Sequence, residues 1–351
     1  MSLTAGKKHK LKTISFVTLA GVIIGILFAN LAFGFTYYRV IKGALIGGLI
    51  TSISSSFEMF FFQKKFKRLN FSVELLLRSL FYVLLISFST LLVVVIHESL
   101  EDEVNVIAAL LGKDVSDFLT GDFIYVFIFA IVVSLSVNFV WQINKMLGRG
   151  VLLNIMLGKY RRPTSEERIF MFLDIKSSTT LGEKLGANNY SSFLQDFFFD
   201  ITDPIIETLG EIYQYVGDEI VLTWKPDKGL PDNNCLNCFF KIQNKITERK
   251  NFYLENYGVV PGFKAGLHIG EAIVTEVGDL KKDIVYHGDV LNTASRIQSE
   301  CNNLNQKLLI SGEILKRFKL NSWFHVESMG FFKLRGKEKE IELYGVREKS
   351  S

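Results

Sequence analysis

The sequence predicts a chain in two parts: four transmembrane α-helices followed by an α+β domain. Three observations lead to this prediction. From Thr13 to Gln142, the 351-residue chain consists mainly of long apolar stretches. After Arg161, charged and apolar residues alternate as they do in a soluble domain. In this second part, short apolar runs interleave with segments of helical periodicity, which indicates helices combined with a mainly antiparallel sheet.

Four apolar stretches are long enough to cross a bilayer, which takes about 20 helical residues. They cover residues 13–34, 40–62, 73–96 and 123–143. The first stretch is too long for a signal peptide, and three more stretches follow it. We therefore expect an integral membrane protein with the lipid bilayer as a partner and a membrane domain at residues 1–144.

Charged residues beside these stretches predict their orientation. Basic residues gather at the N-terminus, in the second connection and after the fourth stretch, whereas the third connection is acidic. The basic residues are Lys7, Lys8, Lys10, Lys12, Lys64, Lys65, Lys67, Arg68, Lys145, Arg149, Lys159, Arg161 and Arg162. Because basic connections stay on the cytoplasmic side, we expect both termini in the cytoplasm, beneath the cell (inner) membrane.

Small residues four positions apart occur in the first two stretches, at Gly21 and Gly25 and again at Gly43 and Gly47. That spacing allows membrane helices to approach closely. The pattern fits a tight bundle or a dimer seam, and it also fits ordinary glycine in membrane helices.

Ionisable side chains also occur in these stretches. Glu58 stands in the second one, where a carboxyl group marks either a functional site or a side chain that reaches the interface. Glu74 and Arg78 stand four apart in the third, and we expect them to pair.

The composition argues against two classes of protein. The net charge is only +4, and the basic residues lie at membrane edges, so no nucleic-acid partner is expected. An odd number of cysteines argues against a disulfide framework, and we expect three free thiols, at Cys235, Cys238 and Cys301.

A connector is expected at residues 145–167, ahead of the α+β domain at residues 168–351. The apolar run at 151–157 indicates a short amphipathic helix, which nearby glycines weaken and Pro163 ends. In a dimer, this segment would carry changes in bundle packing to the second domain.

The expected elements of that domain alternate between strands and helices. We predict a strand at 169–173, an interrupted helix at 181–209 and a hairpin at 211–215 and 220–224. A helix at 238–257 follows, and then two strands, 264–268 and 272–277, on either side of Gly270. The remaining expected elements are a helix at 290–301, a strand at 308–311, a short helix at 312–318 and strands at 331–334 and 341–346.

Two aspartates occupy positions suited to metal chemistry. Asp174 ends an apolar run, and Asp218 sits at the predicted hairpin turn. Carboxylates on neighbouring strands bind hard divalent cations, and a pair of such ions serves phosphoryl chemistry. Aspartate also simply ends strands and forms turns, so each residue alone has a structural explanation.

Two further segments suit phosphate binding. The hydroxyl-rich residues after Asp174 suit a triphosphate at a helix start, although a plain helix cap would look the same. Asn292 and Arg296, four apart, share a helical face that could clamp a phosphate, and Asp289 on that face is expected to cap the helix.

His268 and His287 are expected to be packed or turn histidines.

Four segments in this order resemble the catalytic domain of class III adenylyl and guanylyl cyclases. They are FLDIKSST at 172–179, YVGDE at 215–219, HGDVLNTASR at 287–296 and LRGK at 334–337. The resemblance covers essentially the whole second part. It implies a ferredoxin-like α+β domain that works as a homodimer, with active sites at the subunit interface and a nucleoside triphosphate as substrate.

The resemblance also implies roles for the residues that match. Asp174 and Asp218, aided by the Ile175 carbonyl, would bind two Mg²⁺ or Mn²⁺ ions. The triphosphate would lie against Ile175, Lys176, Ser177, Ser178 and Thr179.

Further roles follow for the second half of the domain. Asn292 would orient the ribose, and Arg296 of the other subunit would stabilise the transition-state phosphate. Arg335 or Lys337 would hold the terminal phosphates. The 3′-hydroxyl would attack the α-phosphate, giving cyclic AMP and pyrophosphate from ATP, which is the favoured substrate.

The sequence departs from the family at the two base-reading positions. Adenylyl cyclases typically have Lys where this chain has Gln214, and Asp or Thr where it has Val285; guanylyl members have Glu and Cys. A glutamine amide both donates and accepts, so it could read either purine. GTP and pyrimidine nucleotides therefore stay open as substrates.

Three other functions compete with this interpretation. A catalytically silent nucleotide-binding membrane receptor would be free to lose the acidic pair and the Asn292/Arg296 pair, and this chain keeps both. Few buried charges argue against a transport protein. A diguanylate cyclase would need a paired glycine that is missing beside Asp218.

Overall fold

The computed structural model contains two compact units, Met1–Met146 and Leu147–Ser351. It describes residues 5–33, 35–62, 70–101, 103–148, 151–319, 323–337 and 339–349. The basic connection at 63–69 lies outside these residues, as do Gly34, Asp102, Arg149 and Gly150. The predicted architecture, apolar helices followed by an α+β domain, is confirmed.

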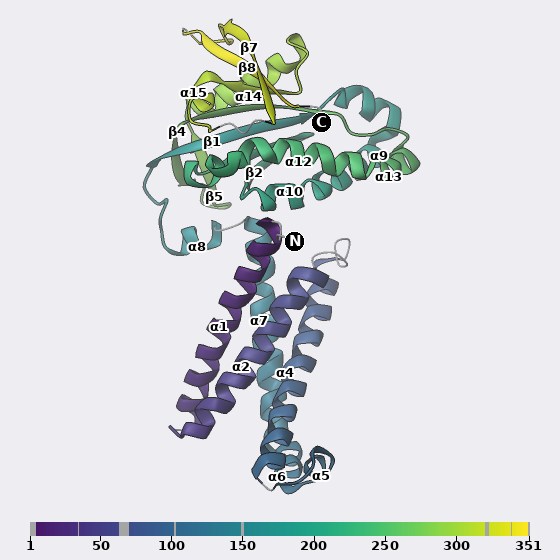
Figure 1. The fold of residues 1–351 in the computed structure, drawn as a ribbon, viewed down its shortest axis with the longest axis vertical. Helices are drawn as coiled ribbons and strands as arrows, with labels where there is room; N and C mark the ends of the chain where they lie inside the picture. The colour runs from purple at the N-terminus through teal and green to yellow at the C-terminus, as the bar shows by residue number, and fades with distance from the viewer. Residues whose placement is uncertain are drawn as a thin grey trace. The chain divides into compact units, whose positions relative to one another are not determined.

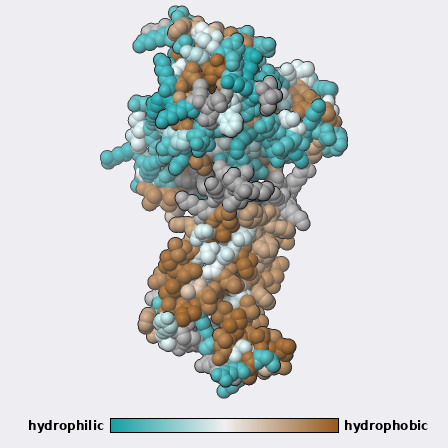
Figure 2. All heavy atoms as spheres, in the orientation of Figure 1, coloured by the Kyte–Doolittle hydropathy of each residue, from teal (hydrophilic) through white to brown (hydrophobic). Residues whose placement is uncertain are grey.

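The first unit is helical. Its long helices are α1 (Ala5–Phe33), α2 (Tyr37–Phe57) with the π-helical turn η1 (Glu58–Phe62), α4 (Phe71–Glu101) and α7 (Phe123–Leu147). Each includes a segment long and apolar enough to cross a membrane, and Figure 2 shows mostly apolar side chains on the visible side of these helices. Between α4 and α7 lie the short elements α5 (Val106–Leu110), α6 (Lys113–Asp117) and η2 (Phe118–Asp122).

Glycines form the contact between α1 and α2. A Cβ atom placed on Gly25 would lie 2.0 Å from the Gly43 carbonyl oxygen, and one on Gly47 would lie 2.2 Å from the Gly21 carbonyl oxygen. Any larger side chain would push the helices apart. In the described residues, both glycine pairs therefore lie in the contact between α1 and α2 of the same chain.

A buried ion cluster joins η1 to α4. The Arg78 guanidinium binds Glu74 at 2.5 Å, as the sequence predicted, and it also binds the Glu58 carboxylate. Tyr82 donates a hydrogen bond of 3.1 Å to Glu58. Glu58 is therefore buried and paired within the bundle.

The second unit contains an eight-stranded sheet in the order β2-β3-β1-β4-β6-β8-β7, with β5 paired to the outer part of β4. The β4–β6 pair is parallel, and the other pairs are antiparallel. The strands are β1 (Thr164–Ile175), β2 (Glu211–Val216), β3 (Glu219–Trp224), β4 (Phe263–Val277), β5 (Asp283–His287), β6 (Leu308–Ser311), β7 (Phe324–Phe332) and β8 (Ile341–Glu348).

Helices cover both faces of this sheet (Figure 1). The main core lies beneath α9 (Ser178–Asp200), α10 (Thr202–Glu207), α12 (Asn234–Glu248) and α13 (Lys250–Tyr257). On the other face, α14 (Asp289–Asn303) packs Val290 and Ala294 against Phe170 and Phe172 of β1. Shorter helices are α8 (Val151–Met156), α11 (Pro226–Gly229), η3 (Pro231–Asn233) and α15 (Gly312–Leu315).

Helix α14 rests directly on the backbone of β4. A Cβ atom on Gly266 would lie 2.3 Å from the main-chain nitrogen of Gln298 and 2.6 Å from the carbonyl oxygen of Ala294. Glycine at this position therefore sets how closely α14 approaches the sheet.

Several predicted boundaries were wrong. Gly270 does not separate two strands, because β4 runs unbroken through it; the glycine makes room for Val290 of α14, 3.2 Å from where a Cβ would lie. The expected helix at 238–257 is two helices that meet at Arg249. Strand β5 was not predicted at all, and β7 begins seven residues before the expected strand at 331–334.

Candidate active site

The acidic pair comes together at one end of the sheet. Asp174 is the second-last residue of β1, where Glu219 of β3 and Lys264 of β4 are its pairing partners. Asp218 lies in the tight turn between β2 and β3, which requires the positive φ of +61° at Gly217. The hairpin thus brings Asp218 beside the end of β1, as the sequence predicted for neighbouring strands.

Negative charge is concentrated around Asp174. Its Oδ2 atom accepts a hydrogen bond of 3.0 Å from Gln298 Nε2 and lies 3.4 Å from Lys264 Nζ. Burial raises the pKa of Asp174, and so does the neighbouring Asp218 carboxylate. Burial also raises the pKa of Glu219 to about 7, with a further contribution from the charges of Asp174 and Asp218. The site therefore favours added positive charge.

The donors of this site fit a hard divalent cation. The Oδ2 atom of Asp218 is buried and accepts no hydrogen bond, so it is available to a ligand. Within the described residues, no three His, Cys, Asp or Glu side chains form a metal cluster. Mg²⁺ is commonly held by one or two carboxylates together with substrate phosphates, which is the donor set that Asp174 and Asp218 offer.

The segment after Asp174 turns sharply into α9. The Lys176 N–H donates to the Gly262 carbonyl at 2.8 Å, and Ser177 adopts a left-handed φ of +56°. Ser177 precedes the first helical residue, yet its side chain makes no capping hydrogen bond. Ser178 and Thr179 form the first turn of α9, so this helix start lies next to the end of β1 that carries Asp174.

The candidate site residues of helix α14 lie on two sides of the helix. Gln298 is buried against the sheet and binds Asp174, whereas Asn292 is exposed. At about 3.6 residues per turn, Asn292 and Arg296 lie on the side of the helix roughly opposite to Gln298. In a single chain these two residues therefore face away from the acidic pair.

The loop after β7 lies against the start of α14. The Lys337 ammonium forms an ion pair with Asp289, the first residue of α14. The Arg296 guanidinium lies near Gly336, with Nη2 3.3 Å from where a Cβ of Gly336 would be. Arg335 is exposed. The carboxylate of Asp289 thus pairs with this loop, and the N-cap position belongs to Gly288, contrary to the predicted capping role.

The two base-reading candidates lie on β2 and β5. Gln214 is exposed on the edge strand β2, opposite Val221 of β3. Val285 is half-buried on β5, opposite Thr275 of β4. Strands β2 and β5 are not neighbours in the sheet.

Comparison with known proteins identifies the second unit. The family model described as "Adenylate and Guanylate cyclase catalytic domain" matches residues 162–348, more than half of the chain. The chain belongs to the adenylate and guanylate cyclase family. The match includes every position at which the sequence predicted a cyclase site residue.

Individual relatives agree with this family. The chain is 34% identical over 221 residues to "Adenylate cyclase 2" of Rhizobium meliloti (strain 1021), a match that covers 63% of this chain and 61% of the relative. It is 26% identical over 188 residues to "Adenylate cyclase 1" of the same organism, covering 52% of this chain and 27% of the relative. The matches thus span less than two thirds of these two relatives.

A solved structure supports the fold. The structure of a bacterial light-regulated adenylyl cyclase superposes with a TM-score of 0.53 at 21% sequence identity. The match covers 62% of this chain and 64% of that one. At this identity the likeness concerns the fold alone.

Some residues around the candidate site were not predicted from the sequence. Lys264 and Gln298 both contact Asp174, and Glu219 lies opposite it in the register. Lys264 and Gln298 belong to no recognisable motif, and strand register and helix rotation bring them to the site. Glu219 stood inside the YVGDE segment, where its adjacency to Asp218 was the available signal.

The predictions for His268 and for the cysteines are confirmed. His268 is buried and bonds Ser311 Oγ at 2.7 Å, and burial lowers its pKa to about 4, so the expected packed histidine is confirmed. The cysteines are free and buried, as expected: Cys235, Cys238 and Cys301.

Proposed function

We propose that this chain is a membrane-anchored nucleotidyl cyclase that converts ATP to 3′,5′-cyclic AMP and pyrophosphate. The observation that carries the proposal is the Asp174/Asp218 pair, two half-buried carboxylates with excess negative charge at the end of β1. The relatives described as adenylate cyclases favour ATP among the substrates. Four helices long and apolar enough to cross a membrane support anchoring, and the positive-inside pattern supports a cytoplasmic cyclase domain.

The residues of the chain divide the chemical tasks. Asp174, Asp218 and the Ile175 carbonyl would hold two Mg²⁺ or Mn²⁺ ions. Bound ions would lower the pKa of the attacking hydroxyl and neutralise charge on the leaving phosphates. The main-chain amides at the start of α9, in the segment Lys176, Ser177, Ser178 and Thr179, would bind the triphosphate.

The reaction itself is an intramolecular displacement. A bond forms between the ribose 3′-oxygen and the α-phosphorus, the bond from that phosphorus to the β-phosphate oxygen breaks, and the hydroxyl proton passes to solvent. Asn292 would hold the ribose so that the hydroxyl faces the phosphorus, and Arg296 would stabilise the extra negative charge. Arg335 or Lys337 would hold the departing pyrophosphate, and Gln214 and Val285 would contact the base.

The orientation of α14 supports a site shared between two copies. Because Asn292 and Arg296 face away from the acidic pair of their own chain, they are placed to serve the pair of a second chain. A homodimer would then build two equivalent sites.

A direct assay tests the function. Purified full-length protein is incubated with ATP, GTP, CTP or UTP in the presence of Mg²⁺ or Mn²⁺, and mass spectrometry identifies any cyclic product. We expect cyclic AMP from ATP. Asp174→Asn should abolish turnover, while Asp227→Asn, which changes an exposed aspartate of α11, should not. A domain that makes no cyclic nucleotide would instead be a silent nucleotide-binding receptor.

A complementation experiment tests the shared site. Asp174→Ala and Asn292→Ala are each expected to be inactive alone. Co-expressed, they would form mixed dimers with one intact site, so partial activity should return. Failure of this rescue in verified mixed dimers would contradict a site built from two chains.

A further inference from the structure

The segment ahead of β1 is folded onto the cyclase domain. Val151 and Ile155 of α8 pack against a small core of Tyr160, Val274 and Ile284. The Tyr160 ring is buried, and its carbonyl accepts a hydrogen bond of 2.8 Å from Glu276 N–H on β4. This segment is therefore bound to the β4–β5 pair rather than free as a linker.

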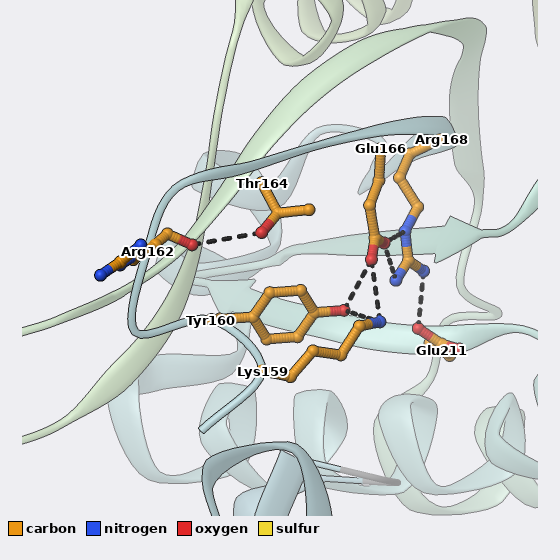
Figure 3. Close-up of polar contacts among 7 residues, drawn as sticks. All are labelled: Lys159, Tyr160, Arg162, Thr164, Glu166, Arg168 and Glu211. Carbon is orange, nitrogen blue, oxygen red and sulfur yellow. Dashed lines mark hydrogen bonds and ion pairs between the residues drawn. The ribbon is translucent and has the colours of Figure 1, made fainter. Parts of the chain in front are cut away.

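A chain of polar contacts continues from this segment into β1 (Figure 3). Glu166 Oε1 accepts hydrogen bonds from Lys159 Nζ at 3.0 Å and from the Tyr160 hydroxyl at 2.9 Å. Its other oxygen, Oε2, accepts from Arg168 Nε at 3.0 Å and lies 2.9 Å from Arg168 Nη2. Burial alone would raise the pKa of Glu166, but these donors lower it to about 2. Glu166 thus joins the segment firmly to Arg168.

Arg168 is the point where this chain of contacts reaches two other strands. It is only 2% exposed. Its Nη1 donates to Glu211 of β2 at 2.9 Å, and its guanidinium carbon lies 5.2 Å above the Tyr286 ring of β5. A buried arginine with two carboxylates and an aromatic face holds all of these groups at a fixed separation.

The contact between β2 and β5 continues through aromatic rings. The rings of Tyr213 and Tyr286 pack edge to face at 4.9 Å, and the Tyr213 hydroxyl accepts from Tyr286 N–H at 3.3 Å. Both rings also pack on Phe170 of β1. Strands β2 and β5, which are not neighbours in the sheet, are therefore in contact across its face. Arg168 lies beside this contact and binds both strands.

The same two strands carry the residues expected to contact the base. Gln214 follows Tyr213 directly, and Val285 precedes Tyr286. We propose that Arg168 is a positioning residue: by holding Glu211 and Tyr286 it fixes the separation of β2 and β5, and so the selectivity of the site for the substrate base. Through Glu166, the segment at 159–166 acts on the same separation. This inference rests on the proposed cyclase function.

A purely structural ion pair would predict a different result. Loss of such a pair lowers the stability and the amount of folded enzyme. The measured activity would then fall by the same factor for every nucleotide. A positioning role predicts a change in relative affinity between bases, because a displacement of the base contacts alters binding of one purine more than that of the other.

The test compares Arg168 with a matched arginine. Arg168→Lys keeps the charge but loses the planar fork, and Arg317→Lys does the same to an exposed arginine that binds Glu167 of β1 at 3.0 and 3.1 Å. Both are made in the full-length chain. For each, KM and kcat are measured with ATP, and Ki is measured for GTP as a competitor.

We expect Arg168→Lys to change the ratio of Ki for GTP to KM for ATP by about fivefold or more, with kcat within about twofold of wild type. Glu166→Gln and Glu211→Gln should shift the ratio in the same direction, and Arg317→Lys should leave it unchanged. If Arg168→Lys does not fold, the ratio measured in Glu211→Gln tests the proposal instead, because Arg168 stays paired with Glu166 in that variant.

Two results would separate the possible failures. An unchanged ratio in folded Arg168 and Glu211 variants of an active enzyme overturns the positioning role alone. A wild-type protein that forms no cyclic nucleotide overturns the proposed function, and the positioning role falls with it.

Discussion

Gly266 offers the sharpest test of how the fold positions the site. In Gly266→Ala, the new Cβ would lie 2.3 Å from the Gln298 nitrogen, whereas ordinary contact begins at 3.4 Å. Restoring that contact requires a displacement of about 1.1 Å between α14 and β4 (3.4 − 2.3). Because the opposing atoms are backbone, no side-chain rotation relieves the clash, and the helix itself must move.

Two effects of this displacement are expected. Overpacking of this kind costs about 1–3 kcal/mol. For a unit of this size, each kcal/mol lowers Tm by roughly 2–4 °C, so the Tm should fall by about 2–12 °C. The 3.0 Å bond from Gln298 to Asp174 would also break, and a misplacement of about 1 Å can reduce turnover about 100-fold.

The assay follows thermal unfolding of the full-length protein by the fluorescence of its tryptophans, which include the buried Trp224, and measures cyclic-nucleotide formation in parallel. Gly270→Ala is the matched control on the same strand. The atoms nearest to its Cβ would belong to side chains, Val290 at 3.2 Å and His268 Nε2 at 3.9 Å, which can adjust. Equal losses of Tm and activity in the two variants would refute the role of Gly266 in seating α14 on the sheet.

Three further outcomes are expected. Burial lowers the pKa of His268 to about 4, so between pH 6.5 and 4 the unfolded chain binds a proton that the folded chain does not. The free energy of unfolding should therefore decrease by up to about 3 kcal/mol as the pH is lowered from 6.5 to 4. His268→Gln should flatten the dependence of Tm on pH. In the helical unit, Gly25→Leu should lower the temperature at which the detergent-solubilised protein aggregates, whereas Gly121→Leu, with nothing within 4 Å of its Cβ, should not. All three cysteines are buried with raised pKa, so maleimide should label none of them in the folded protein and all three after denaturation, as counted by intact mass; rapid labelling of the native chain would contradict their burial.

Local patterns in the sequence were sufficient for the elements that depend on local physics. A helix that crosses a membrane must be long and apolar whatever it packs against, and all four such stretches appear as helices. Asp174 and Asp218 were recognisable because a strand end and a hairpin turn are both coded by adjacent residues. The tight glycine spacing in α1 and α2 likewise predicted a close helix contact.

Other elements could not be read locally. Gly270 was predicted to be a turn residue. The structure shows instead that glycine makes room there for Val290 of α14, twenty positions later in the chain. Strand β5 is only five residues long, and it forms by pairing with residues 273–277 of β4. Lys264 and Gln298 reach Asp174 only through strand register and the rotation of α14.

The sequence by itself determined the order of the two units, the membrane-length helices and the identity of the acidic pair, because each depends on residues close together in the chain. Only the tertiary structure decided which side of α14 faces Asp174 and which strands Arg168 ties together. Pairing between distant strands depends on register and packing summed over the whole sheet, and no short segment contains that information.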